Sequence, residues 1–192
     1  MTSIRLLVGL GCVATGFFVA GCDSDSPKKP PPSDPRPVAD SAPYLCDFVP
    51  ERALRLVTGL DVALDARWSG PQTDNGLCLA HAKSRNAPLG VRWSYNNGDN
   101  VVEEQRKGWS GTADQPIPAE LGKGLAVPTA SDATLRPNYV ISVFSCGKKR
   151  PWISIDFAPV VRGRDAVRDM VDFMRIAERR FGEIHKCTPR PS

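Results

Sequence analysis

The first 22 residues constrain this chain most, because they decide in which compartment the rest of it folds. Met1–Arg5 carries one positive charge, and Leu6–Gly21 follows as sixteen residues without a charge. This arrangement is typical of a signal peptide, and the apolar run is shorter than the roughly 20 residues that a membrane-spanning helix needs. We therefore predict that residues 1–21 are a signal peptide and that the remaining chain folds outside the cytoplasm, where cysteines oxidise to disulfides.

The apolar run ends in the four residues Val19-Ala20-Gly21-Cys22. They resemble the bacterial lipobox, in which an aliphatic residue and two small residues precede a cysteine that receives a diacylglycerol thioether. The resemblance implies cleavage before Cys22 and a lipid anchor at that residue, on the extracytoplasmic face of the cell membrane. Several acyl chains, such as palmitate, anchor a protein stably, whereas a single chain binds marginally. An ordinary secretory signal, with Cys22 left as a free thiol, is the alternative.

Residues 22–43 differ in composition from the rest of the chain. Seven of the eighteen prolines lie between Asp23 and Pro43, and Val38 is the one aliphatic residue there that is larger than alanine. Such a segment lacks the apolar surface needed to fold by itself, so we predict an extended tether between the lipid and a single domain at residues 44–192. A length of 192 residues suits one domain with short extensions.

From Tyr44 onward, apolar residues recur with helical or strand periodicity. Helices are predicted at 50–58, 100–109 and 165–181, and strands at 61–68, 77–83, 89–95, 125–128, 139–146 and 152–158. Asn100 and Glu103 have the spacing of a capping box, and Arg168 and Asp172 have that of a helical ion pair. Because strands joined by short turns pair antiparallel, we predict an α+β fold with a mostly antiparallel sheet of about five to six strands, covered by two to three helices.

Four cysteines remain once Cys12 leaves with the signal peptide and Cys22 takes the lipid: Cys46, Cys78, Cys146 and Cys187. An even number of cysteines in an extracytoplasmic domain indicates disulfides, and four cysteines allow three pairings. We favour Cys46 with Cys78 and Cys146 with Cys187, while the nested and crossed pairings stay open. A metal site or a thiol nucleophile built with His81 or His185 is the competing interpretation, but no Cys-x-x-Cys or other ligand spacing supports it.

The sequence contains no assembled catalytic motif. There are two histidines, and neither a Gly-x-Ser-x-Gly nor a His-Glu-x-x-His sequence is present. We therefore predict a protein that is not an enzyme and that uses neither a cofactor nor a metal ion. The weak net charge of +4 is spread along the chain, which argues against a nucleic-acid surface. A cell-envelope hydrolase that uses scattered carboxylates is the alternative.

The clearest charged feature is a predicted hairpin tip that contains Lys148, Lys149 and Arg150. These side chains are weak candidates for binding an anionic lipid or polymer of the envelope, since a charged turn is usually only solvated. Three tryptophans on predicted strands are expected to pack in the core rather than to bind a ligand: Trp68, Trp93 and Trp152.

Beyond the lipobox and tether, several features follow one another along the chain: Cys46 ahead of Pro50-Glu51-Arg52-Ala53-Leu54, Cys78 in an early strand, Leu121-Gly122 before a strand pair, and the last helix. Together they resemble the small actinobacterial lipoproteins grouped as domain of unknown function 3558. The resemblance implies a sheet packed against helices with internal disulfides, and it assigns no catalytic residue. We therefore predict a lipid-anchored, non-catalytic binding or sensor-type domain, with a structural partner of another envelope protein as a further alternative.

Overall fold

The computed structural model describes residues 36–83, 86–109, 114–129 and 135–192, which belong to one compact unit. Within them the chain forms the helices α1 (Glu51–Thr58), α2 (Val101–Gly108) and α3 (Ala166–His185) and the 3₁₀ turn η1 (Ala119–Leu121). The strands are β1 (Tyr44–Leu45), β2 (Val49–Pro50), β3 (Asp65–Ser69), β4 (Asn75–His81), β5 (Leu89–Ser94), β6 (Gln115–Pro116), β7 (Lys123–Pro128), β8 (Asn138–Cys146), β9 (Trp152–Phe157) and β10 (Pro189–Pro191). In this part of the chain, no helix combines the length and the apolar character needed to cross a membrane.

The described strands build one antiparallel sheet in the order β3-β4-β5-β9-β8-β7-β6, with β10 paired to β8. β1 and β2 form a small separate sheet. The predicted α+β class is confirmed, although the main sheet has eight strands. The additional strands β6 and β10 are two and three residues long and contain proline, so no alternation in the sequence indicates them. β3 begins at Asp65, later than predicted, because Asp65 is the first residue of this segment that has a partner on β4, where it lies across from His81.

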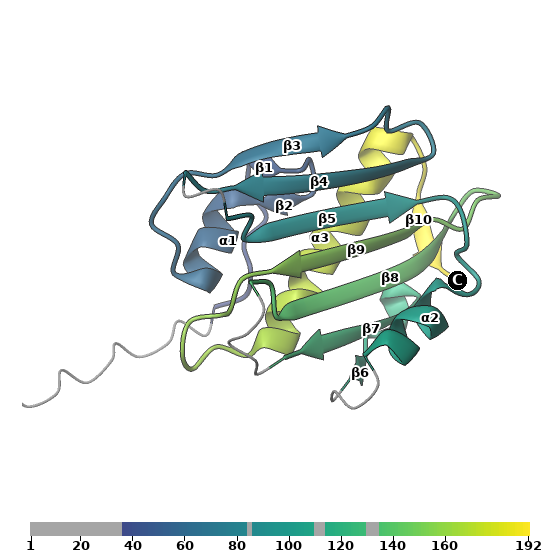
Figure 1. Ribbon diagram of the computed structural model, residues 1–192. Coiled ribbons are helices and arrows are strands. Elements are labelled where there is room, and N and C mark those ends of the chain that lie inside the picture. Colours follow the sequence, from purple (N-terminus) through teal and green to yellow (C-terminus); the bar gives the residue numbers. More distant parts are fainter. Residues whose placement is uncertain (1–35, 84–85, 110–113, 130–134) are drawn as a thin grey trace, which may run out of the picture. The chain divides into compact units, whose positions relative to one another are not determined.

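α1 and α3 lie on one face of the sheet, and α2 lies on the other (Figure 1). Alternate residues of the central strands point toward α3, as Val91 and Trp93 on β5 and Ile153 and Ile155 on β9 do, and all four are buried. The apolar stripe of α3 meets them with Met170, Phe173, Met174, Ala177 and Phe181. The main core therefore lies between α3 and one face of the sheet.

Two disulfides join Cys46 to Cys78 and Cys146 to Cys187, which confirms the favoured pairing. The first ties the turn between β1 and β2 to the middle of β4, with 5.7 Å between the Cα atoms. The second links the end of β8 to the segment after α3, with 5.5 Å between the Cα atoms. In the chain-entropy description, loops of this length contribute about 3–4 kcal/mol each. Both ends of the domain are thus fixed to the sheet.

The predicted capping box at the start of α2 is wrong. Asn100 has helical backbone angles, φ −110° and ψ −21°, and its side chain makes no capping hydrogen bond. Glu103 instead accepts from Arg106 Nη1 at 2.9 Å. The preceding turn supplies another contact, because Asn97 Nδ2 donates to Glu104 Oε2 at 2.9 Å. A cap residue needs an extended backbone to direct its side chain at the free amides, and Asn100 does not have one.

The ion pair predicted between Arg168 and Asp172 on α3 is also wrong. Asp172 accepts from Arg175 Nη1 at 3.0 Å and from the backbone amide of Val38 at 3.3 Å. Asp172 is therefore paired with the next turn of α3 and with the amino-terminal segment. The helix itself begins as its sequence predicts, since the side chain of Asp165 accepts hydrogen bonds from the first-turn amides.

Residues 36–43, which belong to the predicted tether, contact the domain. Val38 is half-buried and packs against the main core. Asp40 pairs with Arg179 on α3 and accepts a hydrogen bond from the Tyr44 hydroxyl at 2.7 Å. Packing against the domain therefore starts ahead of Tyr44.

Two carboxyl groups of α3 are buried: Asp169 is paired with Arg164, whereas Glu178 lies next to a hydroxyl group. Glu178 on α3 is buried, and its Oε1 is 2.6 Å from Ser142 Oγ, which itself lies 2.5 Å from the carbonyl oxygen of Leu121. The hydroxyl has a single hydrogen, and the carbonyl can only accept, so Ser142 donates to Leu121 and a protonated Glu178 donates to Ser142. Burial raises the pKa of Glu178 to about 8, against the hydrogen bond with Ser142, and the carboxylate of Glu120 adds to the rise.

This raised pKa predicts that the domain loses stability as the pH rises. Between the ordinary value of 4.5 and about 8, the folded chain holds a proton at Glu178 that the unfolded chain has released. The free energy of unfolding therefore falls with rising pH across this window, by up to about 1.4 kcal/mol per pH unit, and the fall ends above it. Urea unfolding at a series of pH values measures the slope.

Glu178→Gln keeps a donor at this position without a titratable proton, so the variant should show a flatter profile than the unchanged chain. Glu183→Gln, at an exposed position of the same helix, serves as the control and should retain the slope. Equal slopes for the unchanged chain and Glu178→Gln would contradict this account of the buried carboxyl.

Candidate functional site

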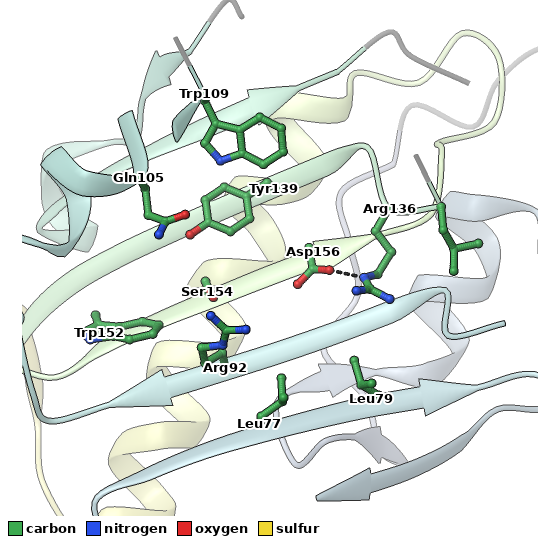
Figure 2. A pocket seen from close by; sticks show the side chains of 11 residues that line it. Leu77, Leu79, Arg92, Gln105, Trp109, Arg136, Tyr139, Trp152, Ser154 and Asp156 are labelled. Atoms are coloured by element: carbon green, nitrogen blue, oxygen red, sulfur yellow. Dashed lines mark hydrogen bonds and ion pairs between the residues drawn. The ribbon is translucent and has the colours of Figure 1, made fainter. Parts of the chain in front are cut away.

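The sheet face opposite α3 is called the open face here, and it carries the other alternating residues of the same strands. Leu77 and Leu79 on β4, Arg92 on β5, Ser154 and Asp156 on β9, and Tyr139 on β8 project from it (Figure 2). Their direction follows from the strand alternation, since their immediate neighbours along each strand fill the main core.

α2 covers only the part of the open face above β7 and β8. Val101 from this helix packs in a small second core with Leu125, Val127, Ile141 and Val143. The residue that follows the helix, Trp109, lies against Tyr139, with 5.5 Å between the ring centroids. Beyond this contact, toward β5 and β4, the open face holds a cavity of about 480 Å³. A cavity of this size suits a small organic molecule.

An ion pair closes one end of the cavity. Asp156 pairs with Arg136, which also donates from Nη1 to the carbonyl oxygen of Ala87 at 2.7 Å. Asp156 lies across from Gly90 in the strand register, and a Cβ atom on Gly90 would be 2.7 Å from Asp156 Oδ1. The missing side chain of Gly90 therefore makes room for the carboxylate. Both charges of the pair are compensated within the protein.

Arg92 rises from the middle of the same surface without such compensation. It is exposed, and it lies across from Leu77 on β4 and from Ser154 on β9. Among the residues that the structure describes, Arg92 has no hydrogen bond or ion pair. The cavity lining consequently includes one guanidinium group whose charge is open to a ligand.

Aromatic rings border this arginine. Trp152 donates from Nε1 to the carbonyl oxygen of Asn96 at 2.7 Å and packs against the second core, so its half-buried ring is held in place at the border of the cavity. Burial raises the pKa of Tyr139, against a hydrogen bond with Ser154, and the tyrosine therefore stays neutral at physiological pH. The arrangement can bind a flat or apolar group between fixed rings, next to a free positive charge.

The two histidines lie away from this cavity. His185 packs against Phe181 and Trp93 on the opposite side of the sheet, with ring centroid distances of 4.0 and 4.7 Å, and burial together with Lys149 lowers its pKa. His81 is half-buried at the end of β4, among the residues that line a separate surface depression. Within the described ranges, no group of histidine, cysteine and acidic side chains could hold a metal ion.

The basic residues predicted at the hairpin tip do not converge on the cavity. They occupy the turn between β8 and β9, where Lys149 Nζ lies 3.9 Å from the ring centroid of Tyr95 and Arg150 pairs with Asp99. Lys148 is exposed at the same turn. Cys22, the predicted lipidation site, lies outside the described residues.

The tryptophans divide between the two faces of the sheet. Trp93 is buried in the main core, and Trp68 is half-buried against it, as predicted. Trp152 lies on the open face, where it packs against the small second core and also lines the cavity, so the prediction of core packing is confirmed for it in part. Its place on the open face could have been predicted from the sequence, because Trp152 alternates with Ile153 and Ile155, which face the main core.

The close approach of Asp156 to Gly90 predicts a specific pattern of stability. Gly90→Ala should destabilise the domain by about 1–3 kcal/mol, since the added methyl group meets the carboxylate. The same change in an Asp156→Ser background should cost much less. Chemical unfolding of the four chains in this double-mutant cycle measures the coupling, and two additive substitutions would contradict the proposed contact.

Comparison of the chain with family models, with curated proteins and with solved structures found no match.

Proposed function

We propose that this chain is a lipid-anchored protein of the bacterial cell envelope, with a non-catalytic binding or sensor-type domain that takes its ligand on the open face. The anchor is proposed at Cys22, on the evidence of the signal sequence and the lipobox-like residues before it. The two disulfides support an extracytoplasmic location, because such bonds persist in oxidising compartments.

The observation that carries the binding function is the uncompensated Arg92 in a cavity bordered by Tyr139 and Trp152. An exposed positive charge bordered by rings and leucines can bind a ligand through both a polar and an apolar contact. The likeness to the lipoproteins of domain of unknown function 3558 remains part of this proposal, and the antiparallel sheet, the covering helices and the internal disulfides support it.

The anchor is tested by metabolic labelling with an alkyne-bearing palmitate analogue in a bacterium that processes lipoproteins. We expect label on the unchanged chain in the membrane fraction, and loss of both label and membrane retention in Cys22→Ser. Cys12→Ser is the matched control, since it removes a thiol from the proposed signal peptide and should leave labelling intact. Label that persists in Cys22→Ser would contradict the proposed anchor.

The binding face is tested with phenylnaphthylamine, a neutral fluorescent compound of two flat ring systems. The chain from residue 22 to Ser192 with Cys22→Ser retains every described residue and avoids competition from lipid. We expect saturable binding that Trp152→Ala weakens by roughly tenfold, because ring contacts contribute about 0.5–1.5 kcal/mol beyond their buried area. Leu56→Ala removes an exposed apolar side chain from α1 and should leave binding unchanged. Equal effects of the two substitutions would overturn the assignment of the open face.

A further inference from the structure

We propose that the cavity on the open face selects small organic anions, and that Arg92 binds the anionic group while the neighbouring rings bind a flat or apolar body. This inference rests on the proposed function, because it names the ligand class of the same site. A sulfonate, phosphate or carboxylate attached to a ring system has the required chemistry.

The charge of the cavity lining supports this choice. Its charged side chains are Arg92, Arg136 and Asp156, so two positive charges and one negative charge leave a net charge of +1. Arg136 and Asp156 neutralise each other at one end. The remaining positive charge belongs to Arg92, and a guanidinium group with all its donors free binds an oxyanion more strongly than it binds a neutral acceptor.

The position of Arg92 also limits how the charge can be compensated from within the protein. β5 lies between β4 and β9, and the residues beside Arg92 on those strands are Leu77 and Ser154. Neither side chain carries a charge. In Figure 2 the guanidinium lies below Tyr139, between Trp152 and Asp156. An anion placed there contacts Arg92 and leaves its attached rings next to the aromatic side chains.

The same lining argues against a neutral sugar as the ligand. Sugar hydroxyls are usually held by several free acceptors and donors around an aromatic ring, and carboxylates supply most of the acceptors. The one carboxylate of the cavity, Asp156, is already occupied by Arg136. The Trp152 Nε1 hydrogen is likewise used, by Asn96. The lining also contains the neutral amide of Gln105, but its one uncompensated charge is that of Arg92, and this charge favours an anion with an apolar body.

The experiment compares two probes on the Cys22→Ser chain from residue 22 to Ser192. Anilinonaphthalene sulfonate has the same rings as phenylnaphthylamine and differs by one sulfonate group. Fluorescence titration should give at least tenfold tighter binding of the sulfonate, since hydrogen bonds between a guanidinium group and an oxyanion are stronger than those between neutral groups. Arg92→Gln should abolish this preference while leaving the affinity for the neutral probe within about twofold.

Arg67→Gln is the matched control, because Arg67 is an exposed arginine of the same sheet that pairs with Asp65 outside the cavity. It should retain the preference for the sulfonate. The inference would be overturned if the chain with Arg92 bound both probes equally tightly, or if the preference for the sulfonate survived Arg92→Gln. In both cases the proposed binding face would stand. If neither probe binds, the proposed binding face fails, and the inference fails with it. Thermal unfolding of Arg92→Gln verifies that the variant is folded.

Discussion

The packing of α3 against one face of the antiparallel sheet is the interaction on which the rest of the structure depends. Phe181 illustrates it, because its ring contacts residues from several elements, including Phe144 on β8, Trp93 on β5 and Phe48 near β2. Strand alternation then sends every second side chain to the other face. α2 has eight residues and covers only the β7–β8 end of that face. The cavity therefore exists because the long helix α3 covers one face of the sheet, whereas the short helix α2 leaves part of the other face uncovered.

The two faces of the sheet differ in whether their charged groups are neutralised within the protein. On the core face, burial keeps Glu178 protonated against its hydrogen bond with Ser142, and the buried carboxylate of Asp169 is paired with Arg164. On the open face, Asp156 stays paired with Arg136, and Arg92 keeps a positive charge in contact with solvent. A ligand on the open face can therefore contact both this charge and the rings of Tyr139 and Trp152. We interpret the difference as a division between a structural face and a binding face.

The sequence predicts those parts of the fold that a local pattern determines. Alternation in β5 and β9, the apolar stripe of α3 and the even set of cysteines all lead to the structure that is found. The cap at Asn100 fails because its backbone angles depend on the preceding turn. The site could be predicted only in part, since alternation places Arg92 opposite the core. That β5 lies beside β9, some 60 residues along the chain, depends on long-range pairing that no local pattern encodes.

The most direct test of the account uses the four tryptophans, which give four indole N–H signals in the NMR spectrum of the isotope-labelled chain. Trp109 and Trp152 border the cavity, whereas Trp68 and Trp93 belong to the core face. Titration with anilinonaphthalene sulfonate should shift the first two signals and leave the other two in place, with single Trp→Phe variants assigning each signal. Shifts confined to Trp68 and Trp93 would show that ligands reach the other side of the sheet and would contradict the account.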